Sequence, residues 1–167
     1  MAQRALSKQD AQSATLRSTL ADGSVCFRSP KFTQILTRLA PGQMLVTGIG
    51  YNSGDSAPLI TTEMSREIPR GGKLSAYVNL SAETGQASAA REWWADWVKQ
   101  HRPELNETHL LVRSRIMEMA ISVLGMIVGG GNVKPHSSEA AFVSIIAAAV
   151  PGFRQLPTFP DLPPMLK

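Results

Sequence analysis

Between residues 73 and 150 the chain repeats one pattern of apolar and polar positions three times: a short apolar strand, a turn and an amphipathic helix. The strands alternate apolar and polar residues or are apolar almost throughout, and the helices carry apolar residues three and four positions apart. The pattern predicts strands over residues 73–80, 108–113 and 132–136, and helices that begin near Ser88, Ser114 and Ser138. Strands and helices that alternate in this way predict a parallel sheet with helices packed on it.

The segment before this repeat predicts further strands and one more helix. Residues 24–51 contain short β-like runs separated by proline and glycine, which we interpret as two or three strands in hairpin order. A helix follows, with Ser56 as its N-cap and an apolar face formed by Ile60, Met64 and Ile68. The predicted fold is therefore α/β: a single mixed sheet with two or three N-terminal strands, then three strand-helix units, largely parallel, and about four helices.

The helix predicted from Ser88 contains all three tryptophans of the chain. Trp93, Trp94 and Trp97 fall within one helical face about 100° wide, so all three rings can pack against the sheet together. This spacing favours a core role over a binding platform. One ring at the edge of the face, Trp94, is a candidate for contact with a partner.

The last predicted helix and the tail behind it are unusually apolar. The helix over residues 140–150 is apolar almost all round, which is typical of a helix that is buried or covered by another element. The tail over residues 153–167 contains four prolines and the two phenylalanines Phe153 and Phe159, and we expect it to be extended. Its two phenylalanines predict docking, either on its own domain or on another chain, and docking on its own domain is the simpler interpretation.

Length and composition predict one soluble domain. The 167 residues, 43% hydrophobic and 18% charged, suffice for a single core. We divide the chain into a flexible polar N-terminal arm (1–22), the α/β domain (23–152) and the extended tail (153–167). Neither a signal peptide nor an apolar run long enough to cross a bilayer is evident, which predicts a cytoplasmic location without membrane insertion. The 17 lysines and arginines are spread along the chain, so the net charge of +4 gives no specific support for nucleic-acid binding.

Residues capable of catalysis are few. The chain has three histidines and one cysteine, and neither His101, His109 nor His136 stands at a metal-ligand spacing from another histidine or from Cys26. His136 alone lies at the carboxyl end of a predicted strand, where open α/β sheets bind ligands. The glycines at 129–131 follow a helix and precede a strand, which is the reverse of a phosphate-binding loop. We therefore predict no catalytic residue, no metal and no cofactor.

The order of elements over about residues 24–150 resembles the STAS domain, the family of anti-sigma-factor antagonists such as the SpoIIAA-like proteins. The resemblance is closest in the segments YVNLSAETGQASAAREWWADWVKQHR, THLLVRSRIMEMAISVLGMIV and VKPHSSEAAFVSIIAAA. It implies a bacterial protein-binding module without catalysis. It also implies a switch by phosphorylation of a serine or threonine at the start of the helix after the strand that contains Tyr77, where a helix N-terminus favours an added negative charge.

The corresponding segment makes Ser81, Thr84 and Ser88 the candidate residues for such a phosphorylation or partner switch. Ser81 and Thr84 fall in a predicted loop, and Ser88 lies nearest to the helix start. The family's Asp-Ser-Ser/Thr-Gly sequence is absent, because residues 85–89 read Gly-Gln-Ala-Ser-Ala. This departure favours a simple N-cap role for Ser88 over a phosphorylated one.

The leading functional hypothesis is a non-enzymatic regulatory module that binds a protein partner through residues 81–94 and the tails. Two alternatives stay open: a STAS-like domain that binds a small ligand or lipid, and a component of a homodimer or larger homo-oligomer. An enzyme ranks below these, and it would depend on His136.

Overall fold

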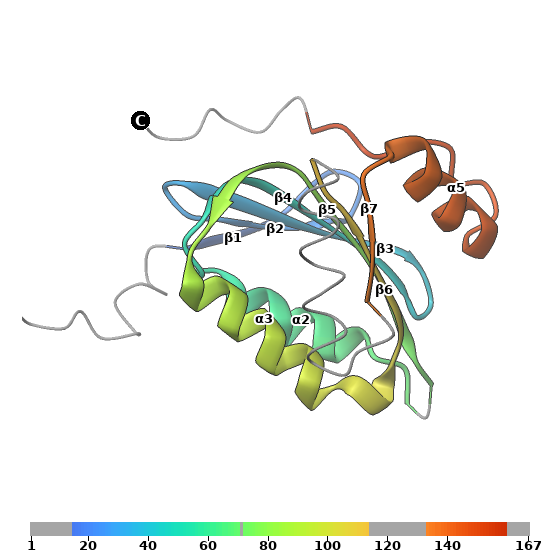
Figure 1. Cartoon of the computed structure of the whole chain (residues 1–167), viewed down its shortest axis with the longest axis horizontal. Helices are drawn as coiled ribbons and strands as arrows, with labels where there is room; N and C mark the ends of the chain where they lie inside the picture. Colours follow the sequence, from blue (N-terminus) through green and yellow to red (C-terminus); the bar gives the residue numbers. More distant parts are fainter. Residues whose placement is uncertain (1–14, 71, 114–132, 160–167) are drawn as a thin grey trace, which may run out of the picture.

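The computed structural model describes residues 15–70, 72–113 and 133–159, which form one seven-stranded sheet with helices on both faces (Figure 1). The strands follow one another across the sheet in chain order. They are β1 (Leu16–Thr19), β2 (Val25–Arg28), β3 (Phe32–Ala40), β4 (Gln43–Asn52), β5 (Leu74–Gln86), β6 (Leu105–Leu111) and β7 (Val133–His136). The described helices are α2 (Ala57–Glu67), α3 (Ser88–Gln100), a short 3-10 helix η1 (Arg102–Glu104) and α5 (Glu139–Ala149).

The sheet is mixed, as the sequence predicts. Strands β1 to β4 form an antiparallel meander, whereas β4 to β7 run parallel. The change of direction begins where α2 first joins two neighbouring strands, because parallel neighbours need a crossover connection while antiparallel ones need only a turn. The α/β class and the single sheet are thus confirmed. The helix predicted from Ser114 lies outside the described residues.

The two faces of the sheet bury separate apolar clusters. Helices α2 and α3 lie side by side on one face, and α5 lies on the other (Figure 1). The first cluster includes Met44, Val46, Ile60, Met64 and Trp97, so the predicted apolar face of α2 is confirmed. The second cluster consists of Leu45, Tyr77, Leu111, Phe142 and Ile146. Neighbouring residues of β4 enter different clusters because successive side chains of a strand point to opposite faces.

Part of the predicted N-terminal arm belongs to the sheet. Residues 16–19 form the edge strand β1, in which Leu16 pairs with Arg28 and Thr19 with Val25. All four side chains of β1 are exposed, so backbone pairing with β2 and the ion pair of Arg17 with Glu63 hold the strand, and no apolar periodicity marks it. The prediction of a flexible arm over 1–22 is therefore wrong for these residues.

Strand β5 is longer than predicted. The sequence predicts a strand that ends at residue 80 and a loop over 81–86, whereas β5 continues to Gln86. Beyond Asn79 it pairs with β4 alone, through two irregularities that each add one residue to β5. At the second, the ring of Tyr51 covers Gly85 so closely that a Cβ there would lie 3.1 Å from Tyr51 Cδ2. Polar residues and glycine are tolerated because this end of β5 is not enclosed between two strands.

Helix α5 and the first part of the tail cover the second face. Ser138 caps α5, since its Oγ accepts a hydrogen bond from the Ala141 backbone N–H at 3.3 Å. Phe142 and Ile146 are fully buried, and Phe153 and Leu156 of the tail pack on the same cluster. Docking of Phe153 on its own domain is thus observed. Within the described residues, no helix has both the length and the apolarity needed to cross a membrane.

Candidate functional site

A groove of about 570 Å³ runs between α2 and α3 on the outer side of the helical layer. Helix α2 contributes small and hydroxylated side chains, and α3 contributes aromatic and polar ones. The lining residues are Pro58, Thr61, Thr62 and Ser65 on one side and Trp93, Asp96, Trp97, Gln100 and His101 on the other. A concave surface in which a few polar groups converge beside aromatic rings is typical of a binding site.

Two indole-to-hydroxyl hydrogen bonds hold the walls of the groove together. Trp93 Nε1 donates to Thr61 Oγ1 at 3.1 Å, and Trp97 Nε1 donates to Ser65 Oγ at 3.0 Å. Both pairs are spaced four residues apart on their helices, so they lie one above the other along the groove. Since both N–H groups are already used, the indoles can offer a bound molecule only their ring surfaces.

The three tryptophans differ in exposure in a way that the sequence did not predict. Trp97 is buried, and Trp94 packs against the first apolar cluster. Trp93 is 39% exposed and lines the groove. Trp94, the candidate for contact with a partner, is half-buried, and Trp93 is the more exposed of the two rings. The sequence shows that the three rings share one face of α3, but which ring stays exposed to solvent depends on how α2 packs against α3.

His101 closes one end of the groove by stacking on Trp97, with ring centroids 4.7 Å apart. Its Nδ1 lies 3.0 Å from the Trp97 carbonyl oxygen and must carry a hydrogen, because a carbonyl only accepts. Its Nε2 lies 3.2 Å from Ser65 Oγ, whose single hydrogen can also reach the Thr61 carbonyl oxygen at 2.9 Å. The His101 ring is thus held against both helices, by Trp97 of α3 and by Ser65 of α2.

Asp96 is the only carboxylate among the residues that line the groove. It is exposed, one helical turn from Trp93 on the same face of α3. The neighbouring acids of α2 are occupied: Glu63 pairs with Arg17 and Arg66, and Glu67 pairs with Arg38. Asp96 has no ion pair with any residue that the structure describes. Among the described residues, the groove thus presents one unpaired negative charge near the partly exposed ring of Trp93.

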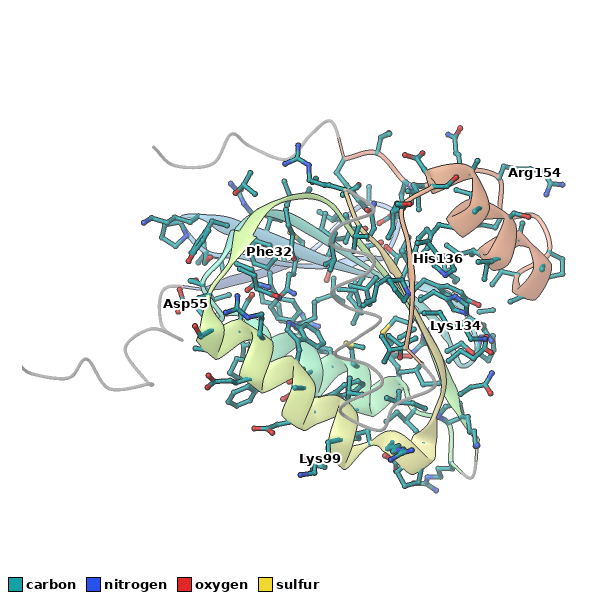
Figure 2. All side chains as sticks on the ribbon, in the orientation of Figure 1. Phe32, Asp55, Lys99, Lys134, His136 and Arg154 are labelled. Carbon is teal, nitrogen blue, oxygen red and sulfur yellow. The ribbon has the colours of Figure 1, made fainter. Side chains whose placement is uncertain are left out.

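A second polar group, unforeseen from the sequence, lies among the parallel strands. His109 Nδ1 is 2.9 Å from His136 Nε2, and His109 Nε2 is 3.0 Å from Glu107 Oε2. Lys134 makes an ion pair with Glu107, and it lies with His136 on β7 (Figure 2). These two neighbours, first Lys134 and then His109, hold the pKa of the Glu107 carboxyl below its usual value.

The histidine pair is part of the packing between sheet and helix. The His109 ring is stacked between Tyr77 at 5.6 Å and His136 at 5.2 Å, and both Tyr77 and His136 contact Phe142 of α5. The side chain of His109 is 5% exposed, so a bound molecule cannot reach it without displacing its neighbours. In the part of the chain that the structure describes, no three His, Cys, Asp or Glu side chains are arranged to hold a metal ion. The pair is therefore a packed and hydrogen-bonded part of the fold.

Glu83 is a buried carboxyl on β5, on the side of the sheet that α2 and α3 cover. It lies against Gly48 of β4, where an added Cβ would come within 2.3 Å of Glu83 Oε1. Burial raises its pKa to about 7, against a smaller opposite effect of the Asn52 side chain. The Asn52 amide is near enough to favour the ionised form, but among the described residues neither Glu83 Oε1 nor Asn52 Nδ2 has a partner in hydrogen-bond geometry. Burying the Glu83 carboxyl therefore costs free energy of folding, and the cost is larger when the carboxyl is ionised.

The predicted switch residues lie at three different kinds of position. Ser81 is on β5, where both its backbone N–H and its Oγ donate to Asn79 Oδ1, at 3.0 and 2.6 Å. Thr84 is exposed at the second irregularity of β5. Ser88 is exposed as the first residue of α3, but Ala87 occupies the N-cap position, so the N-cap role for Ser88 is wrong. Its Oγ accepts instead from Arg91 at 3.4 Å.

The predicted partner residues do not form one surface. Trp94 packs toward the first cluster and Phe153 toward the second, on opposite faces of the sheet. Phe159 is half-buried at the end of the described tail. The sequence does not indicate the groove residues Thr61 and Ser65, because a serine or threonine on a helix usually faces water or bonds to its own backbone. It does not indicate Asp96 either, because an acid on a helix is usually a solvated surface residue.

Comparison with known proteins gives matches in structure alone. No family model matches the sequence, and no curated protein matches it. A protein of the DUF3478 family with a SpoIIAA-like fold from Shewanella loihica PV-4 matches with a TM-score of 0.55 and 11% identity, over 69% of this chain and 93% of that one. The anti-sigma factor antagonist SpoIIAA in its unphosphorylated form matches with a TM-score of 0.50 and 14% identity, over 68% and 96%.

An anti-sigma factor antagonist from Mycobacterium paratuberculosis also matches, with a TM-score of 0.47 and 12% identity, over 77% of this chain and 98% of that one. The first two matches agree with the architecture derived above, a mixed sheet whose parallel strands alternate with helices. Identities this low carry the fold and not the function. The chain has a SpoIIAA-like fold.

Proposed function

We propose that this chain is a non-enzymatic regulatory module that binds a protein partner through the groove between α2 and α3. The observation that carries the proposal is Trp93, an indole 39% exposed at the edge of a concave surface and held there by its hydrogen bond to Thr61. Tryptophan is enriched among residues that dominate binding energy at protein interfaces. A ring already fixed in position loses little conformational freedom on binding.

The fold supports the same reading. SpoIIAA, which shares the fold, is an anti-sigma factor antagonist, and α3 is the helix that follows the Tyr77-containing strand. The predicted surface, residues 81–94, runs from the end of β5 into α3 and includes Trp93. Phosphorylation of Ser81, Thr84 or Ser88, a homo-oligomeric state and a cytoplasmic location stay predictions beside this proposal.

A photocrosslinking experiment tests the proposal. A benzophenone amino acid placed at Gln100, which lines the groove, should crosslink a discrete partner in extracts of the source cells, whereas the same group at exposed Arg154 beyond α5 should not. Trp93→Ala should remove that adduct and weaken binding of the identified partner by about 30-fold, the effect of losing an interface anchor worth about 2 kcal/mol. The Trp93→Phe variant keeps an aromatic ring but removes the N–H that donates to Thr61, so it distinguishes the contribution of the ring from that of the hydrogen bond.

Two controls make the result decisive. The Glu92→Gln variant changes an exposed residue of α3 that does not line the groove, and it should keep full binding. An unchanged melting temperature of Trp93→Ala establishes that binding is lost without loss of the fold. Equal crosslinking from Gln100 and Arg154, or full binding by Trp93→Ala, would contradict the proposed docking groove.

A small molecule is the second candidate for the groove. Its volume of about 570 Å³ falls within the roughly 300–1,000 Å³ that small-molecule sites occupy. In that case a metabolite panel should raise the melting temperature of the chain, and Trp93→Ala should abolish the increase.

A further inference from the structure

We infer that the groove binds an arginine side chain of the partner, with its guanidinium stacked on Trp93 and paired with the Asp96 carboxylate. This inference depends on the proposed function, since it assigns the chemistry of the group that the docking groove receives. It follows from three features of the described residues: the charge of the groove, the chemistry left free on the indole, and the spacing of the two residues on α3.

The charge of the groove selects a cation. Glu63 and Glu67 of α2 are already paired with arginines, and Arg91 of α3 donates to the Gln86 carbonyl oxygen at 2.8 Å. Lys99 lies on α3 but outside the groove lining. Asp96 is therefore the one fully charged group of the lining, and it attracts a positive group while repelling a carboxylate or phosphate.

The free chemistry of Trp93 selects the same sign of charge. Its N–H is bonded to Thr61, so it cannot donate to an acidic or carbonyl group of a partner. Trp93 is still 39% exposed, so ring surface is what it offers, and the face of an aromatic ring carries partial negative charge and attracts cations, most strongly in tryptophan. An arginine satisfies both groups at once, because its planar guanidinium stacks on an indole while its N–H fork donates to a carboxylate.

The spacing of the two residues allows one ligand to reach both. Trp93 and Asp96 are three residues apart on α3, which places them about 5–6 Å apart at Cβ on one helical face. That separation suits a flat group lying between a ring and a carboxylate. The groove is also long enough to hold residues that flank the arginine, because its lining extends from Pro58 to His101 along both helices.

The net charge of the chain makes the test stringent. At +4, the protein as a whole repels a polycation, so a basic peptide that binds must do so at a particular place. The probe is the acetylated, amidated tripeptide of arginine, titrated into the full chain at about 150 mM salt, which screens long-range electrostatic interactions with the rest of the protein. The three indole N–H resonances in a ¹H–¹⁵N spectrum report separately on Trp93, Trp94 and Trp97.

Binding should shift the Trp93 resonance saturably and the Trp94 resonance little. Tricitrulline, which keeps the shape and loses the charge, should give no saturable shift, and trilysine should bind more weakly. Asp96→Asn should weaken triarginine binding by about 5-fold or more, the size expected of a partly exposed charge-assisted contact. Glu92→Gln, an exposed acid of α3 outside the groove, should not alter it.

Equal shifts with tricitrulline, equal affinity for trilysine, or unchanged binding by Asp96→Asn would overturn the arginine assignment. None of these results bears on the crosslinked adduct at Gln100. If the chain forms the Trp93-dependent adduct but does not bind triarginine, the groove binds a partner side chain other than arginine. If the adduct itself is not formed, the proposed docking groove is refuted.

Discussion

Replacing Phe142 by alanine is expected to lower the free energy of unfolding by about 3–5 kcal/mol, the cost of removing a fully buried phenylalanine. Phe142 is 0% exposed and, with Ile146, is one of the two fully buried residues through which α5 meets the sheet. Its ring lies edge-on to Tyr77, with centroids 6.3 Å apart, and 6.2 Å from the ring of His136. The truncation therefore leaves a cavity and loosens the contact between α5 and the histidine pair.

Guanidinium denaturation of the purified chain measures this effect. The matched control is Phe153→Ala, because Phe153 packs on the same cluster but is only half-buried, and it should cost clearly less. A loss below about 1 kcal/mol for Phe142→Ala would mean that α5 does not contribute to the core as the structure has it. Additive effects in the double variant would indicate that helix and tail dock independently.

Replacing Glu83 by glutamine is expected to stabilise the protein at about pH 8, by about 3 kcal/mol at most. Burial raises the pKa of Glu83 from 4.5 to about 7, so the folded state holds its proton more tightly than the unfolded state does. A raised pKa in the folded state contributes stability that is fully present below about pH 4.5 and is lost as the pH rises to about 7. Glutamine has nearly the shape of the protonated acid and cannot ionise.

The comparison should be made across a pH series. The stability advantage of Glu83→Gln over the original chain should be small near pH 4.5, grow up to about pH 7 and then stay constant. Glu92→Gln removes an exposed acid and should show no such growth. Parallel stability curves for the original chain and Glu83→Gln between about pH 5 and pH 8 would show that Glu83 does not titrate in the fold with a raised pKa.

Periodicity in the sequence determined the architecture. Alternating and continuous apolar runs indicated the parallel strands, and the four-residue spacing of Ile60, Met64 and Ile68 indicated the face of α2 that packs on the sheet. Burial of an apolar face is the largest local contribution to folding, so it leaves a regular trace in the chain. The helix start at Ser138 was also readable, because capping is a local interaction.

Elements without such a trace were missed. Strand β1 has four exposed side chains, and the second half of β5 contains polar residues and a glycine. Both are held by backbone pairing with a neighbour, which any residue type except proline can make. A strand that exists only because another strand lies beside it has no periodic pattern of its own.

The candidate site shows the same division. The sequence by itself determined that three tryptophans share one face of a helix and that His109 and His136 lie on predicted strands. Only the tertiary structure decided that Trp93 is the open ring, that Thr61 and Ser65 bind the indoles, and that His109 meets His136. These outcomes depend on the register between α2 and α3 and between β6 and β7, and register is set by packing between distant segments, which no local pattern records.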